Sequence, residues 1–80
     1  MKATVFVTLK QDVLDPQGQA IQRASESLGF AGVRAVRQGK LFEIELDAGS
    51  PEEAREQLGK LCERLLSNPV IEDWRLERLE

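Results

Sequence analysis

The apolar residues of this sequence switch between two spacings, and the order of the switches limits the folds open to the chain. Residues 2–10 alternate between apolar and polar, which predicts a strand with one buried face. Between residues 20 and 28 apolar side chains recur every three or four positions, which predicts a helix that buries a stripe of Ile21, Ala24 and Leu28. Gly29 then supplies a C-terminal stop for that helix.

Two strand-like runs and a second helix start follow. Val33–Arg37 and Leu41–Asp47 are joined by Gln38-Gly39-Lys40, and its glycine can take the positive φ of a tight hairpin turn. We therefore expect these two strands to pair antiparallel. After them, Ser50-Pro51-Glu52-Glu53 combines an N-cap serine, a proline at the first helical position and a glutamate three residues after the cap.

The remaining residues complete a recognisable order of elements. The stripe predicted to face the core on the second helix consists of Ala54, Leu58, Leu61, Cys62 and Leu65. Asn68-Pro69 ends that helix, and Val70–Glu80 alternates as a last strand. The order β-α-β-β-α-β over residues 1–80 predicts one α+β domain. We expect a ferredoxin-like sandwich, with a four-stranded antiparallel sheet and both helices on one face.

The opposite sheet face must meet solvent or another chain. The residues predicted on it are Thr4, Phe6, Thr8, Leu41, Glu43, Glu45 and Arg75. Phe6 and Leu41 are apolar and favour another chain. A domain of this size has a core that supplies only about 3–5 kcal/mol of net stability, so self-association would help. We expect a homodimer or a dimer of dimers, formed through the sheet face or the strand edges.

Side chains suited to catalysis or metal binding are scarce. The chain has no His, no Tyr and one Cys. Cys62 lies on the predicted core stripe, which favours a buried thiol with a raised pKa, and it has no partner for an internal disulfide. Glu43 and Glu45 share a strand face, but alternating charge there more often serves solvation or cross-strand pairing than acid–base chemistry. We expect no catalytic residue, no metal site and no cofactor bound by this chain alone.

The charge distribution argues against nucleic acid. Residues 1–40 hold six Lys/Arg against three Asp/Glu, and residues 41–80 hold five against eleven. These cations are scattered, whereas affinity for a phosphate backbone comes from gathered Lys and Arg. With no targeting segment and no apolar run long enough for a bilayer, the sequence also predicts a cytoplasmic protein without a membrane partner.

One short stretch contains a glycine that needs an explanation. In VLDPQG, Asp15 caps the first helix and Pro16 fixes its first turn, but Gly18 then costs about 0.5–1 kcal/mol relative to alanine. That cost is tolerable where another backbone must approach closely.

Two further stretches have the character of surfaces. VRQGK places Arg37 and Lys40 around Gly39 at the predicted hairpin tip. NPVIEDW runs from Asn68 and Pro69 through Glu72 and Asp73 to Trp74, an aromatic residue that serves either the core or a contact.

VLDPQG, VRQGK and CERLLSNPVIEDW together resemble the small PurS subunit of phosphoribosylformylglycinamidine (FGAM) synthase, and the similarity runs along the whole chain. The sequence departs from the family pattern at Ala35, where an Asp is common, and at Trp74, where a Tyr is frequent. The loss of an acid at Ala35 puts in doubt any polar contact made there.

The resemblance implies a non-catalytic assembly subunit of a glutamine-dependent, ATP-consuming carbon–nitrogen ligase in de novo purine biosynthesis. A glutaminase subunit and a large synthetase subunit are implied to use the glutamine, ATP and Mg. The small subunit is implied to dimerise, join the two and assist ammonia transfer between them. The partner interface is then expected at Asp15, Pro16, Gly18, Arg37, Gly39, Lys40, Asn68, Pro69, Glu72, Asp73 and Trp74, with Phe6 and Leu41 on the homo-oligomer face.

Two other functions stay open on the residues alone. A regulatory domain of the same topology would bind a small molecule, such as an amino acid or nucleotide, without partners. A small enzyme acting through Glu43 and Glu45 would show activity in isolation.

Overall fold

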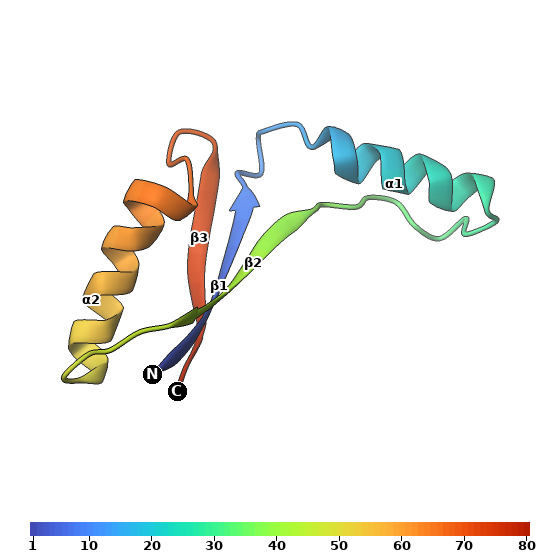
Figure 1. Cartoon of the computed structure of the whole chain (residues 1–80). Helices are drawn as coiled ribbons and strands as arrows, with labels where there is room; N and C mark the ends of the chain where they lie inside the picture. The colour runs from blue at the N-terminus through green and yellow to red at the C-terminus, as the bar shows by residue number, and fades with distance from the viewer.

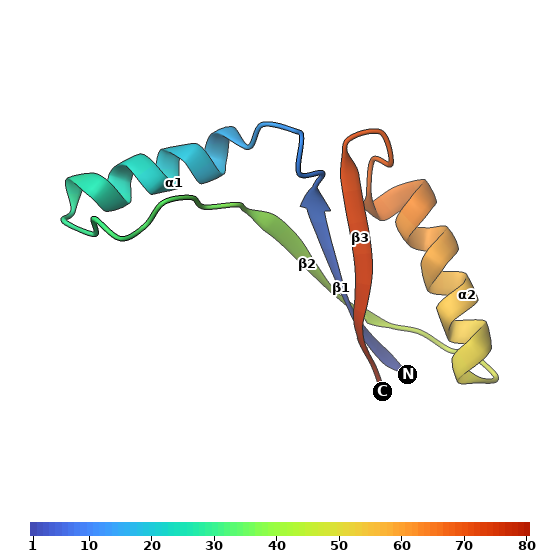
Figure 2. The ribbon, with the colours of Figure 1, turned by 180° about the vertical axis from the view of Figure 1, so that it is seen from behind.

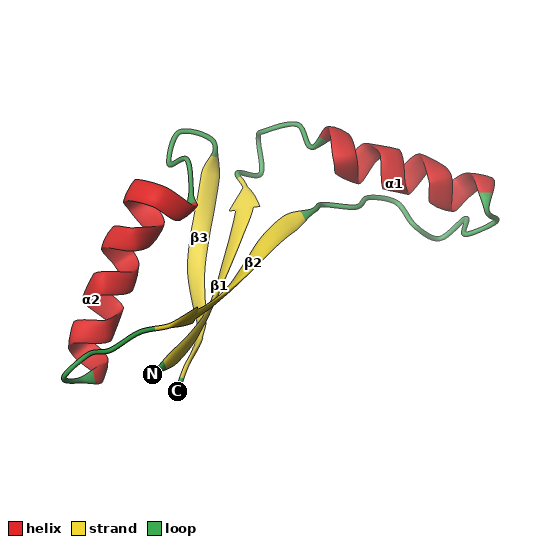
Figure 3. Cartoon of the chain, viewed as in Figure 1, coloured by secondary structure: helices red, strands yellow, loops and turns green.

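The computed structural model describes residues 1–80 as a three-stranded antiparallel sheet with two α-helices (Figures 1 and 3). The elements in chain order are β1 Lys2–Leu9, α1 Pro16–Ser27, β2 Gly39–Glu45, α2 Pro51–Leu61, the π-helical turn η1 Cys62–Leu66, and β3 Glu72–Leu79. The strand order is β2-β1-β3, which places β1 at the centre. The α+β class is confirmed. None of the helices combines the length and apolar character that a membrane crossing requires.

The core lies on one face of the sheet, between β1 and α2. Ala3, Val5 and Val7 are buried on this face of β1, as the alternation predicts. Val5 is opposite Phe42 on β2 and Leu76 on β3, so the three strands contribute to the same apolar layer. From α2 and η1, Ala54, Leu58 and Cys62 close this layer.

The start of α2 follows the predicted capping pattern. Ser50 Oγ accepts a hydrogen bond from the Glu53 amide at 3.2 Å. The Glu53 carboxylate reaches back to the Gly49 amide at 2.9 Å, one residue before the cap. Two free amides near the helix start are thereby satisfied.

The end of this helix differs from the prediction at Leu65. The Ser67 amide donates to the Cys62 carbonyl at 2.9 Å, the five-residue spacing of a π-helical turn. This turn holds more residues than an α-helical turn, so it shifts the apolar stripe along the chain. Leu66 packs against the core instead, while the side of η1 that carries Leu65 faces solvent and leaves it 73% exposed.

The predicted hairpin and the fourth strand are wrong. Residues 33–38 have no strand partner, and Gly39 begins β2 with a negative or extended φ, since Gly29 is the one glycine with a positive φ. Asp15 accepts a hydrogen bond from the Gln38 amide, and Gly39 is paired with Thr8 on β1. These two contacts hold the chain extended at the point where a hairpin would reverse it. Residues 33–38 therefore lead into β2 without a reversal of direction (Figures 1 and 2).

The prediction that both helices cover one sheet face is also wrong. α2 lies beside β3, whereas α1 projects away from the sheet together with residues 28–38 (Figure 2). We call residues 16–38 the arm. Its predicted core stripe is exposed, with Ile21 at 45% and Leu28 at 76%. The radius of gyration is 16.0 Å, whereas a compact chain of this length has about 12 Å.

Candidate partner-binding surface

The three candidate stretches meet at the end of the sheet where β1 ends and β2 and β3 begin. The Arg37 guanidinium donates to the carbonyls of Val13 and Lys10, both at 2.9 Å. Lys10 Nζ in turn lies 2.7 Å from Asp73 Oδ1. We call this region the sheet-end surface and define it by Lys10, Asp15, Arg37, Lys40, Glu72 and Asp73. Residues from three separate parts of the sequence thus form one charged patch.

At one margin of this surface, Asp15 connects the two ends of the arm, the start of α1 and Gln38. Its Oδ1 accepts from the Gly18 amide at 3.0 Å, which is the predicted N-cap bond, and its Oδ2 accepts from the Gln38 amide at 2.6 Å. The hydrogen bond from Gln38 and then that from Gly18 lower the pKa of Asp15, and the positive charge of Arg37 adds to them against the opposing effect of burial. The charged carboxylate therefore links the start of α1 to residues 36–38 through two hydrogen bonds.

Gly18 is explained by a close backbone approach. A Cβ at this position would collide with the carbonyl of Val36, and Gly18 is buried. Its φ is not positive, so the requirement is space and not a special backbone conformation. The expectation of a close approach is confirmed, and the approaching backbone belongs to the chain's own arm.

Gly39 and Lys40 belong to a strand and not to a turn. A Cβ on Gly39 would lie 2.8 Å from Thr8 Cγ2 and 2.9 Å from the Val7 carbonyl oxygen, so this glycine permits close strand pairing. Lys40 Nζ lies 3.4 Å from Glu72 Oε2, in a pair that leaves the lysine side chain 60% exposed. Lys40 is therefore available for an interaction with a partner.

The stretch from Asn68 to Trp74 shows mainly local roles. Asn68 Oδ1 accepts from the Val70 amide at 3.1 Å, and the Glu72 carboxylate accepts from the Asn68 amide at 2.7 Å. These bonds fix the turn before β3, and Pro69 within it is exposed. Trp74 is half-buried against the core residues of β1 and η1. Its ring thus contributes to the core, while Asp73 beside it is exposed.

The open sheet face has the predicted residues on it. Phe6 lies directly opposite Leu41 on β2 and Arg75 on β3. The Arg75 guanidinium carbon is 5.0 Å from the centroid of the Phe6 ring, within the range of a cation–π contact. Leu41 is 52% exposed. The face is therefore mixed in character, with one apolar residue left uncovered.

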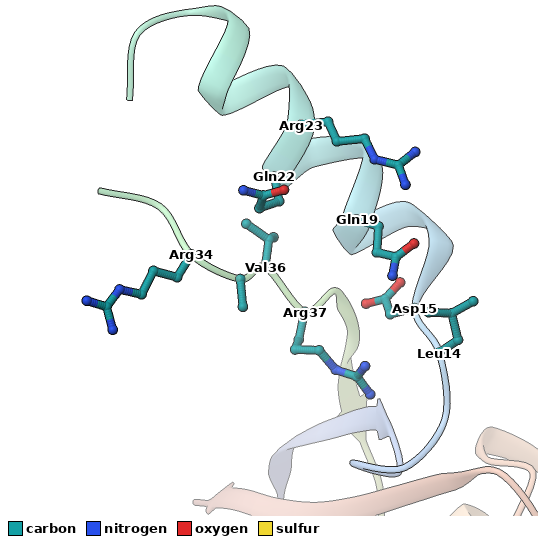
Figure 4. Close-up of a pocket in the computed structure, with 9 residues that line it drawn as sticks. Leu14, Asp15, Gln19, Gln22, Arg23, Arg34, Val36 and Arg37 are labelled. Atoms are coloured by element: carbon teal, nitrogen blue, oxygen red, sulfur yellow. The ribbon is translucent and has the colours of Figure 1, made fainter. Parts of the chain in front are cut away.

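A groove separates α1 from residues 34–37. Its lining consists of Leu14, Asp15, Gln19, Gln22, Arg23, Arg34, Ala35, Val36 and Arg37. Figure 4 shows Gln22 and Val36 facing each other across it, with Arg23 and Arg34 pointing outward. Gln22 Nε2 donates to the Val33 carbonyl at 3.1 Å, and Asp15 and Arg37 bond to backbone as described. The polar groups at the groove floor are thus engaged within the arm.

The chemistry of the chain outside these surfaces is limited. Cys62 is buried, and desolvation followed by the nearby charge of Glu63 raises the pKa of its thiol, as predicted. No three His, Cys, Asp or Glu side chains gather in an arrangement that could hold a metal ion. What the surface residues offer is charge and shape for recognition. Lys10 is absent from the sequence-based candidates. A cation directly after the first strand, and a pair of acids at the start of the last strand, are a signal that could have found it.

Comparison with known proteins identifies one family. The model of the PurS family, phosphoribosylformylglycinamidine (FGAM) synthase, matches residues 2–80. The FGAM synthase subunit PurS of Mycobacterium leprae is 47% identical over 77 residues, which cover 96% of this chain and 94% of that protein. A crystal structure of PurS from B. subtilis has a TM-score of 0.88 at 43% identity and covers 99% of this chain and 98% of its own. A chain in the structure of PurLQS from Thermotoga maritima has a TM-score of 0.86 at 32% identity and covers 99% of each chain.

Proposed function

Because the chain belongs to the PurS family of FGAM synthase subunits, we propose that it is the non-catalytic assembly subunit of this ligase in de novo purine biosynthesis. Its partners are the large synthetase subunit and the glutaminase subunit, in the cytoplasm. These partners use the ATP, Mg and glutamine, and the chain binds none of them alone. The match to a chain of the T. maritima PurLQS structure supports membership of such an assembly.

The observation that carries this proposal is the convergence of three sequence stretches on the sheet-end surface. Arg37, Lys10 and Asp73 are linked there by the contacts given above, and Lys40 with Glu72 adjoins them. The surface offers charges of both signs, and the six residues that define it include no His, Cys, Ser or Tyr. Such a surface fits recognition of another protein better than turnover of a substrate.

Assembly has a physical benefit for this reaction. Ammonia released by one active site is protonated and diluted in bulk water, whereas two sites held in one complex keep its local concentration high. We assign to this chain the role of holding the two sites together and assisting that transfer.

Self-association is part of the proposal. The chain exposes Leu28, Phe30 and Leu41 and is elongated, so a monomer leaves much apolar surface in water. A homodimer, or a dimer of dimers, would cover these residues. Two copies would also present two sheet-end surfaces in a fixed geometry.

Co-elution of this chain with both larger subunits tests the proposal. Lys40→Glu reverses a charge on the sheet-end surface and places a negative charge beside Glu72. We expect this variant to bind the partner subunits at least about tenfold more weakly, and therefore to co-elute less with them. Lys60→Glu is the matched control, because Lys60 is equally exposed, at 61% against 60%, but lies on α2. Equal co-elution of the two variants would contradict the assignment of this surface. Gly18→Leu is unsuitable as a probe of docking, because it would collide with Val36 inside the chain.

A further inference from the structure

A cleft lies beside the sheet-end surface, where η1 meets the start of β3. Three residues of its lining, Lys10, Glu72 and Asp73, also belong to the sheet-end surface. Its volume is about 500 Å³, within the range of sites that bind ligands. The cleft is therefore continuous with the contact region described above and has room for a side chain of another protein.

Trp74 gives the cleft an aromatic wall. Its ring is half-buried, because one part packs on the core and another part lines the cleft. Beside the ring edge, α2 has Gly59, where an added Cβ would lie 3.8 Å from Trp74 Cη2, an ordinary contact distance. The φ of Gly59 is not positive, and a glycine within a helix lowers its stability relative to alanine. The chain's own packing therefore does not require Gly59, whereas access of another group to the indole does.

The charged side chains of the cleft leave one carboxylate without a partner. Two cations and three acids line the cleft, so its formal charge is negative. Lys10 pairs with Asp73 at 2.7 Å, and Glu72 pairs with Lys40 at 3.4 Å. The Glu63 carboxylate takes part in none of the six ion pairs of the chain. Glu63 is therefore free to pair with a cation that enters the cleft.

The end of the helix adds to this attraction for a cation. The last carbonyl groups of a helix form the negative end of its dipole, and Glu63 lies in the closing turn η1. Arg64 is the next residue, but side chains one position apart on a helix do not face each other, and the two form no ion pair. The cleft thus combines a free carboxylate, a helix C-terminus and an indole ring, each of which attracts a positive charge.

We propose that this cleft binds an arginine side chain of one of the two larger subunits, with the guanidinium group held by the Glu63 carboxylate and the Trp74 ring. A guanidinium group is planar, stacks on aromatic rings and donates two parallel hydrogen bonds to a carboxylate, whereas the ammonium group of lysine is compact and strongly hydrated. Pro69 supplies carbon surface for the methylene groups of the arginine. The inference rests on the proposed function, because it assigns the arginine to a partner in that assembly.

Titration of the isolated chain with blocked amino acids tests the chemistry of the cleft. Trp74 is the only tryptophan, so its indole N–H gives a single signal in a nitrogen-15 NMR spectrum. N-acetyl-arginine amide should shift this signal in a saturable way. N-acetyl-citrulline amide, which has the same shape without the charge, and N-acetyl-lysine amide should each bind at least about tenfold more weakly. Equal affinity for either of these two compounds, or no shift with the arginine amide, would overturn the proposal.

A pair of charge-removing variants tests the role of Glu63. Glu63→Gln should lower the affinity for the arginine amide about tenfold. Glu52→Gln is the matched control, because Glu52 is also exposed and in no ion pair but lies in the first turn of α2. The amide signals of the remaining residues report whether each variant keeps its fold. Equal affinities of the two folded variants would overturn the proposal, and the comparison of arginine with citrulline on the parent chain does not depend on either variant.

Co-elution with the larger subunits tests whether the arginine belongs to one of them. Glu63→Lys places a cation where the guanidinium group would bind, so we expect it to bind the larger subunits at least about tenfold more weakly than the parent. Glu52→Lys, with the same change of charge, should co-elute as the parent does. Undiminished co-elution of Glu63→Lys would overturn the inference. If Lys40→Glu still weakens co-elution in that case, the proposed function stands and only the arginine site is wrong.

Discussion

Asp15 binds two separate pieces of backbone with one carboxylate. Its role as a helix cap follows from the sequence, because capping depends on residues within one turn. Its bond to Gln38 does not, because that contact spans 23 positions of the chain. Gly18 is also only partly explained by the sequence. The cost of a glycine in the first turn of a helix predicts that another backbone approaches closely, but not that this backbone is Val36.

The lowered pKa of Asp15 makes the arm sensitive to acid. Because the pKa in the folded chain lies below the unfolded value of about 3.9, the ionised form favours folding above that value. This contribution is lost as the pH falls through the folded pKa. We expect the parent to lose more stability than Asp15→Asn between pH 6 and pH 2.5, measured by urea unfolding. If the free energies of unfolding of the two proteins changed in parallel with pH, the stabilising role of the ionised Asp15 would be contradicted.

Gly18 is expected to reject the smallest added side chain. Gly18→Ala gains up to about 1 kcal/mol of helix propensity, but the collision with Val36 should cost about 1–3 kcal/mol. Gly32→Ala is the control, because a Cβ there has open space around it. Urea unfolding should show lower stability for the first variant only. A Gly18→Ala protein more stable than the parent would show that the helix start and Val36 can separate freely.

At the scale of elements, local sequence patterns predict most of the helices and strands, but they do not predict the π-helical turn η1. The strands β1 and β3, the cap of α2 and the stop after α1 all follow from alternation, capping residues and glycine. The π-helical turn η1 does not, because apolar spacing assumes the regular α-helical period. The predicted hairpin is wrong because Gln38-Gly39-Lys40 is compatible with a turn and with an extended strand. The contacts with Asp15 and Thr8 select the extended strand.

The shift of the apolar stripe in η1 can be measured with two neighbouring leucines. Leu66→Ala removes a side chain that packs on the core and should cost about 2 kcal/mol. Leu65→Ala removes one that is mostly in water and should stay within about 0.5 kcal/mol of the parent. The free energy of unfolding in urea distinguishes the two. Equal costs would show that the helix keeps its regular period through Ser67.

At the scale of the whole molecule, the chain has the architecture of a part and not of a self-contained domain. Its core covers one side of a narrow sheet, its arm stands free, and its candidate contacts gather at one end of that sheet. The sequence predicted the class, the order of most elements and the candidate stretches. It does not predict the open arm, because the alternation of a strand does not show whether a partner strand is available in the same chain.

The rate at which the two larger subunits form FGAM, the amidine product, tests the central claim most directly. With glutamine as the nitrogen source, we expect the rate to fall at least about tenfold when this chain is omitted, because the two active sites are then no longer held together. With ammonium salt in place of glutamine, the rate should be the same with and without the chain. Full glutamine-dependent synthesis in its absence would contradict the claim that this chain acts by assembly.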